Sequence, residues 1–115
     1  MAISVYSCGY LGIESYIVEI ETDISNGLPV FNIVGMGDLA IIESKERIRS
    51  CFKNIGLDFP VKRVLVNLSP ADIKKKGSSF DLGIFLGILS NIGKIRNIEN
   101  FKNYLILGEI SLNGE

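Results

Sequence analysis

The sequence contains no histidine and only two cysteines, Cys8 and Cys51. Without histidine, the usual zinc sites and any Ser-His or Cys-His catalytic pair are excluded. Two isolated cysteines are typical of buried thiols in a reducing compartment rather than of a disulfide framework. The first residues, Met1–Ser4, do not resemble a secretory signal, and the longest apolar stretch, Leu82–Leu89, is too short to cross a bilayer. We therefore expect a soluble, cytoplasmic protein with no membrane segment.

Positive charge is also missing from the first third of the chain, because residues 1–38 contain no lysine or arginine. That segment has five acids, whereas residues 39–76 hold nine bases against four acids. With 47% hydrophobic and 22% charged residues, the 115-residue chain is globular and large enough for one core. The uneven charge predicts either an ordinary solvated surface or a basic face that meets a polyanion.

Segments rich in β-branched and aromatic residues, one of them with clean alternation of apolar and acidic residues at Tyr16–Asp23, predict five strands, and longer apolar periods predict two helices. The expected strands are Ala2–Tyr10, Tyr16–Asp23, Pro29–Val34, Arg63–Leu68 and Tyr104–Gly108, and the expected helices cover residues 38–55 and 78–93. Ser25-Asn26-Gly27 predicts a hairpin, so the first three strands would be consecutive antiparallel neighbours. Asn113-Gly114 is a stronger hairpin signal that has no return strand, so we expect a chain cut from a longer protein.

Local signals mark the ends and faces of the two helices. Asp38 is a favoured N-cap for the first helix, and Gly56 suits the left-handed residue that follows its end. Its buried stripe is expected to comprise Ile41, Ile48, Phe52 and Ile55. In the second helix Gly83 and Gly87 share one face, which predicts a close approach to another backbone. That helix is apolar nearly all round and should be central.

Two stretches come near to nucleotide-binding motifs. The segment 35–40 formally matches the dinucleotide fingerprint, but it follows the third strand of an antiparallel run, and Asp38 would place a negative charge beside the pyrophosphate. The segment 87–94 has the wrong spacing for a P-loop and lies at a helix end, where the dipole disfavours phosphate. We interpret both stretches as structural.

A basic run, Lys74-Lys75-Lys76, precedes Gly77-Ser78-Ser79. Three lysines beside a helix N-terminus could hold a phosphate of nucleic acid or nucleotide, or they could form a solvated loop. A serine at this place could act as a nucleophile only with a lysine as its base, because the chain has no histidine. The alternative is that Ser78 or Ser79 caps the helix, since Ser78 and Asp81 resemble a capping box.

Taken together, five segments resemble the amino-terminal domain of the bacterial magnesium-chelatase-like proteins, the ComM/YifB family. The segments, in family order, are Val34–Asp38, Glu43–Arg49, Val66–Asp72, Gly77–Leu82 and Leu107–Gly114. The resemblance covers essentially the whole chain. It departs at Gly37, where the family usually has proline, and a position that accepts proline is a shaped turn rather than a phosphate cradle.

The resemblance implies an α+β two-layer fold of order βββαβα with a left-handed βαβ crossover. This is the fold of the Lon protease proteolytic domain, of GHMP kinases and of the second domain of a small-subunit ribosomal protein. It also implies that residues 1–115 form a single domain, followed in a longer chain by an AAA+ ATPase domain that binds ATP and magnesium. The full protein is expected to form a hexameric ring and to be associated with DNA branch migration during natural transformation. No cofactor or metal is expected in the chain itself.

By the same resemblance, Ser79 falls where Lon-type peptidases keep their nucleophile. The partner lysine of those peptidases lies beyond the position of Gly108-Glu109, and Phe80-Asp81 replaces the small residues that follow the Lon serine. Ser79 is therefore interpreted as a vestigial nucleophile position in a chain with no complete catalytic site. The leading hypothesis is a non-catalytic module that supports ring assembly and contacts DNA through Lys74–Lys76. The alternatives are a cryptic serine peptidase and a module of a true magnesium chelatase.

Overall fold

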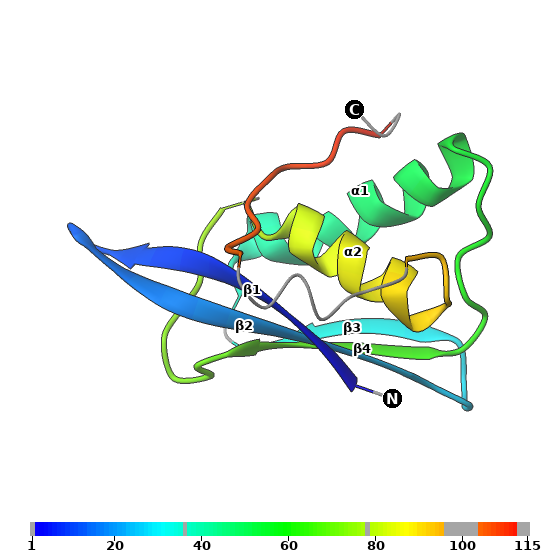
Figure 1. The fold of residues 1–115 in the computed structure, drawn as a ribbon, viewed down its shortest axis with the longest axis horizontal. Helices are drawn as coiled ribbons and strands as arrows, with labels where there is room; N and C mark the ends of the chain where they lie inside the picture. Colours follow the sequence, from blue (N-terminus) through cyan, green and yellow to red (C-terminus); the bar gives the residue numbers. More distant parts are fainter. Residues whose placement is uncertain (1, 36, 78, 96–103, 113–115) are drawn as a thin grey trace.

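The computed structural model describes residues 2–35, 37–77, 79–95 and 104–112. Its elements are β1 (Ala2–Leu11), β2 (Glu14–Ser25), β3 (Val30–Val34), α1 (Leu39–Asn54), β4 (Arg63–Ser69) and α2 (Asp81–Asn91). Both helices lie on one face of a single sheet (Figure 1). The predicted two-layer α+β class and the βββαβα order are therefore confirmed.

The order of the strands in the sheet differs from the prediction. The sheet runs β1-β2-β4-β3, with β1–β2 and β2–β4 antiparallel and β3–β4 parallel. The expected pairing of the second strand with the third is wrong, because β4 lies between them. The inward side chains of β4 are Val64, Val66 and Leu68, all fully buried. A strand with such a buried face gains the most hydrophobic stabilisation in the middle of a sheet. The turn at residues 25–27 makes the chain reverse its direction, but it does not determine which strand pairs with β2.

The connection from β3 through α1 to β4 joins two adjacent parallel strands, which makes it a βαβ unit. The handedness of this crossover stays a prediction. In β2, Val18 and Ile20 are buried beneath the helices, whereas Glu19 and Glu21 lie half-buried on the opposite face. The predicted alternation of this strand is confirmed, and its acids lie on the face that no helix covers (Figure 1).

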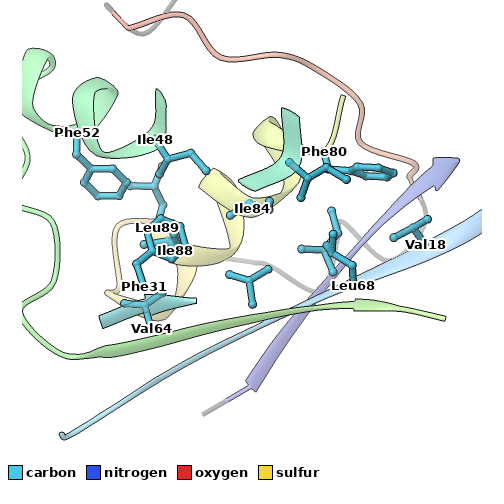
Figure 2. Close-up of a cluster of buried hydrophobic side chains, with 13 residues drawn as sticks. Val18, Phe31, Ile48, Phe52, Val64, Leu68, Phe80, Ile84, Ile88 and Leu89 are labelled. Carbon is cyan, nitrogen blue, oxygen red and sulfur yellow. The ribbon is translucent and has the colours of Figure 1, made fainter. Parts of the chain in front are cut away.

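The hydrophobic core fills the space between the helices and the sheet. Figure 2 shows Ile84 and Ile88 of α2 between Ile48 and Phe52 of α1 and the side chains of the sheet. The thiol of Cys51 is buried in this layer, and burial raises its pKa. Cys8 is only half-buried, so the prediction of two buried thiols holds for Cys51 alone.

The signals at the ends of α1 are largely confirmed. A carboxylate oxygen of Asp38 accepts the Ile41 N–H at 3.1 Å, and Gly56 follows the helix with a φ of +83°. Ile41, Ile48 and Phe52 are buried as predicted. Ile55 is 44% exposed instead, because the helix ends at Asn54 and the C-cap residue turns away from the core.

The glycine face of α2 packs against β2. A Cβ atom added at Gly83 would lie 2.5 Å from Cδ1 of Ile20, and one added at Gly87 would collide with the hydroxyl of Thr22. Close approach is thus confirmed, but the neighbours are side chains of β2 rather than another backbone. Since α2 also contacts β1, its central place is confirmed as well.

Two predictions fail around α2. The helix begins at Asp81, and Phe80 occupies the N-cap position without a side-chain hydrogen bond, so Ser79 does not cap it. Ser78 lies outside the described residues.

Residues 104–108 do not form a strand, because a single backbone hydrogen bond, from Ile106 N–H to the Tyr6 carbonyl, joins them to β1. Asn113-Gly114 also lies outside the described part of the chain. Among the described residues, no helix has the length and apolar character needed to cross a membrane.

Candidate functional site at the starts of the two helices

Residues of all five family segments contact one another around the ends of β3 and β4 and the start of α2. Gly35 makes the first contact: its φ is +111°, and a Cβ atom there would collide with the Leu68 carbonyl oxygen. Only glycine allows both this backbone conformation and such a close approach. The two parallel strands therefore leave the sheet in contact, which brings residues 70–77 against the start of α1.

Lys75 is the centre of a first group of contacts, which we call the lysine cluster (Gly35, Asp38, Pro70, Lys75 and Gly77). The side chain of Lys75 is fully buried, and its amine donates to the Gly35 carbonyl at 2.7 Å and to the Pro70 carbonyl. Burial lowers the pKa of this amine, and the nearby charge of Asp72 only partly offsets the effect. The lysine thus ties the end of β3 to the loop after β4.

Asp38 completes the lysine cluster through both its backbone and its carboxylate. Its N–H donates to the Lys75 carbonyl at 3.0 Å, and its second carboxylate oxygen accepts the Gly77 N–H at 3.0 Å. Because the carboxylate already occupies the start of α1, where a phosphate would otherwise bind, the geometry supports the structural interpretation of segment 35–40.

The burial of Lys75 divides the basic run. Lys74 and Lys76 are exposed, but the amine of Lys75 faces backbone carbonyls and cannot reach a phosphate in this arrangement. Contact with nucleic acid therefore stays a prediction for Lys74 and Lys76 only. The sequence carried no signal for this division, because the run lies in a loop without periodicity.

Arg47 and Asp81 form a second group of contacts, the ion-pair cluster (Ala40, Arg47, Asp81 and Ile110). The guanidinium binds the carboxylate through two nitrogens, with Nε 2.6 Å from Oδ2 and Nη2 3.0 Å from Oδ1. Nη2 also donates to the Ala40 carbonyl at 2.8 Å, and Asp81 accepts the Ile110 N–H at 3.3 Å. Asp81 is 1% exposed, so this ion pair joins α1, α2 and the last described segment inside the molecule.

The ion pair sets the electrostatics of this second cluster. The hydrogen bond to Asp81 raises the pKa of Arg47 despite partial burial, and the charges of Asp81, Glu109 and Glu43 act in the same direction. Sequence analysis missed the pair because Asp81 fitted a capping box. The one available signal was that Arg47 and Asp81 belong to different family segments, Arg47 in the middle of α1 and Asp81 at the start of α2.

Ser79 lies between the two clusters and is half-buried. Its carbonyl accepts the Gly108 N–H at 2.9 Å, and the Gly108 carbonyl accepts the Leu82 N–H at 3.0 Å. No hydrogen bond from a lysine to its hydroxyl is present in the described part of the chain, and the amine of Lys75 is directed at Gly35 and Pro70 instead. The vestigial nucleophile position stays a prediction.

The rest of the described surface offers no stronger chemical site. Among residues 2–35, 37–77, 79–95 and 104–112, no three His, Cys, Asp or Glu side chains lie close enough together to hold a metal ion. One hollow of about 310 Å³ lies on the uncovered sheet face beside Glu21 and Leu65. Another of about 300 Å³ lies beside Arg49 and Phe59, near the end of α1. Neither hollow includes a side chain of the two clusters.

Comparison with known proteins places the chain among magnesium-chelatase-like proteins. Residues 20–115 match the family model ChlI, described as subunit ChlI of Mg-chelatase. Competence protein ComM of Haemophilus influenzae is 37% identical over 111 residues, which cover 96% of this chain and 22% of the relative. The uncharacterized protein YifB of Salmonella typhimurium is 36% identical over 110 residues, with shares of 96% and 22%. The uncharacterized protein Rv2897c of Mycobacterium tuberculosis is 40% identical over 109 residues, with shares of 95% and 22%.

The chain belongs to the magnesium-chelatase-like ComM/YifB family, as its sequence motifs predicted. It spans about a fifth of the length of the curated relatives that it matches. Seven of the nine residues that form the two clusters lie in the five segments that carried the resemblance, and Ala40 and Lys75 lie outside them.

Proposed function

We propose that this chain is a non-catalytic amino-terminal module of a longer magnesium-chelatase-like AAA+ ATPase. The observation that supports this proposal is the position of three side chains of the family segments, and of Lys75 in the loop between two of those segments. Asp38, Arg47, Lys75 and Asp81 all contact other groups of the chain itself and hold its segments together. In this proposal ATP and magnesium bind to a domain outside these 115 residues, and the full protein assembles into a hexameric ring in the cytoplasm.

In this proposal the module acts as a stiff body. The lysine cluster joins β3 to the loop after β4, and the ion-pair cluster joins α1 to α2. A body whose strands and helices are joined by such contacts can transmit a movement of a neighbouring domain without deforming, because packed interiors are poorly compressible. Such a body would support ring assembly and could position DNA for branch migration.

The DNA-binding part of the proposal can be tested in the longer protein with Lys74→Gln and Lys76→Gln combined. Two lost phosphate contacts should weaken binding of single-stranded DNA and lower the slope of log affinity against log salt by about 1.4. Lys53→Gln, an exposed lysine near the end of α1, is the matched control. Unchanged affinity and an unchanged slope in the double variant would remove DNA contact at this loop from the proposal.

The non-catalytic part can be tested with a serine-reactive phosphonate. If Ser79 is vestigial, the longer protein is not labelled at Ser79, because no described base activates its hydroxyl. Labelling that disappears in Ser79→Ala would instead identify the cryptic serine peptidase.

The description of the matching family model favours a second candidate, a module of a true magnesium chelatase. The longer protein would then insert magnesium into a tetrapyrrole in the presence of ATP. DNA-stimulated ATP hydrolysis without metal insertion would favour the first candidate, and metal insertion without any effect of DNA would favour the second.

A further inference from the structure

No helix covers one face of the sheet (Figure 1), and two acidic side chains of β2 lie on that face, which we call the acidic row (Glu19 and Glu21). They are two residues apart on the strand, so both point to the same side, and both are half-buried. Glu19 accepts the hydroxyl of Ser4 at 2.6 Å, and Glu21 accepts the side-chain amide of Asn67 at 3.2 Å. These neutral partners hold the two carboxylates in place without offsetting their charge.

The acidic row borders a hollow in the same face of the sheet. This hollow, of about 310 Å³, lies beside Glu21 and Leu65. Arg63 is the one basic residue in the sequences of the four strands, and it pairs with Ser25 at the end of the β2–β4 register that is farthest from Glu19. The uncovered face is therefore hollowed and acidic, and a convex basic surface would complement it.

The chain has such a surface on α1, which we call the basic ridge (Lys45 and Arg49). These two residues are four positions apart, so their side chains lie on the same face of the helix. The guanidinium of Arg49 lies 5.0 Å from the ring centroid of Phe59 and 5.6 Å from that of Phe31. The two rings hold the side chain in place without neutralising it, and Arg49 is exposed.

We propose that the basic ridge of one copy of the protein binds the acidic row of a second copy. Neighbouring side chains are about 6.8 Å apart along the row and about 6 Å apart along the ridge, so each cation can face one carboxylate. Row and ridge are different surfaces, so the contact is head-to-tail, and repeated contacts of this kind close into a ring when the rotation permits it. This contact rests on the proposed function, in which copies of the longer protein assemble into a ring.

Charge complementarity identifies the occupant. The acidic row repels polyanions such as nucleic acid, so its partner is a basic protein surface. A second copy supplies that surface at a matching spacing, and the side chains on both sides are already held in place, which lowers the entropy lost on binding. The contact also uses the uneven charge of the sequence, because the row lies within residues 1–38 and the ridge within residues 39–76. A basic segment of another protein is the competing occupant.

Charge reversal in the longer protein tests the contact, with association followed by sedimentation velocity in the absence of DNA. Arg49→Glu and Glu21→Lys should each raise the dissociation constant between copies at least about tenfold, because like charges then face each other. Lys94→Glu is the matched control, since it changes the net charge as Arg49→Glu does, at an exposed position after α2. Unchanged association in either Arg49→Glu or Glu21→Lys would overturn the proposal.

Mixing the two variants tests whether the partner is a second copy. Copies with Arg49→Glu keep the acidic row, and copies with Glu21→Lys keep the basic ridge. In an equimolar mixture every contact between unlike copies joins opposite charges, so the mixture should associate about as tightly as the original protein. A mixture that associates as weakly as each variant alone would overturn the proposal and favour the competing occupant. Loss of DNA affinity in Arg49→Glu with unchanged association would overturn it as well.

Folding is checked by circular dichroism and by the urea midpoint, which should change little because Arg49 is exposed and Glu21 lies on the uncovered face. If a reversal unfolds the protein, Arg49→Gln and Glu21→Gln replace it, with an expected rise in the dissociation constant of about threefold. An original longer protein that stays monomeric would contradict both the ring and this contact. A protein that assembles and hydrolyses ATP, but associates equally well with Arg49→Glu, would contradict this contact alone.

Discussion

Arg47 and Lys75 are two cationic side chains that both hold parts of the chain together, but their surroundings differ. Each joins segments that are distant in the sequence, but Arg47 faces the carboxylate of Asp81, whereas Lys75 donates to two backbone carbonyls. The pKa of Arg47 is accordingly raised and that of Lys75 is lowered. A full opposite charge offsets the cost of burial, and the carbonyl dipoles of the lysine cluster do not. The two clusters should therefore respond differently to mutation and to pH.

The largest effect is expected for Arg47→Met. This change leaves the carboxylate of Asp81 buried without its counter-ion, which should lower the free energy of unfolding by about 3–5 kcal/mol. Urea denaturation followed by circular dichroism gives the value. Lys53→Met, an exposed position on the same helix, should change the stability by less than about 0.5 kcal/mol. If Arg47→Met lowered the free energy of unfolding by less than about 1 kcal/mol, the ion pair would not be the main interaction that joins the two helices.

A smaller loss is expected for Asp38→Ala, which removes acceptors from the N–H groups of Ile41 and Gly77. Loss of the helix cap alone should cost about 1–2 kcal/mol, and the loop contact adds to it. The comparison variant is Asp58→Ala, an exposed acid outside both clusters. Equal midpoints for the two variants in urea would show that Asp38 does not hold the loop.

Lys75→Met should cost less than Arg47→Met, about 1–3 kcal/mol. The change leaves two backbone carbonyls without a donor, but it also removes an amine whose charge is disfavoured by burial. The same urea experiment measures it, with Lys74→Met as the neighbouring exposed control. If Lys75→Met proved more costly than Arg47→Met, the contrast between the two clusters would be wrong.

The smallest effect is the dependence of stability on pH. Since the pKa of Lys75 is lower in the folded than in the unfolded chain, the folded chain binds fewer protons between the two values. The free energy of unfolding should therefore rise with pH and level off above the ordinary lysine value of about 10.4. Subtracting the pH profile of Lys75→Met from that of the original chain isolates this rise. A flat or falling difference would contradict the lowered pKa.

Sequence analysis located most of the fold because its signals are local. The strand alternation, the Asp38 cap and the turn at Gly56 each depend on a few neighbouring residues. Strand order could not be read in this way, since the Ser25-Asn26-Gly27 turn says nothing about β4, which enters the sheet from much later in the chain. The segment 104–108 shows the same limit, because its run of apolar residues fits an extended chain whether or not a neighbouring strand pairs with it.

The candidate site was harder to predict for a related reason. The lysine run marked the correct loop, but Lys75 meets the Gly35 carbonyl 40 residues away in sequence. Arg47 and Asp81 are 34 residues apart, and nothing local to either residue specifies the other. Family resemblance brought these segments together as a list of motifs, and only the three-dimensional arrangement revealed that several of their members bind one another.

A double-mutant cycle on Arg47 and Asp81 tests most directly whether these family residues hold the fold together. Unfolding free energies are measured in urea for the original chain, Arg47→Met, Asp81→Asn and the double variant. Each single change leaves the remaining side chain without its partner. The double variant should therefore lose about 1–3 kcal/mol less stability than the sum of the two single losses. Losses that add to within about 0.5 kcal/mol would contradict a structural ion pair.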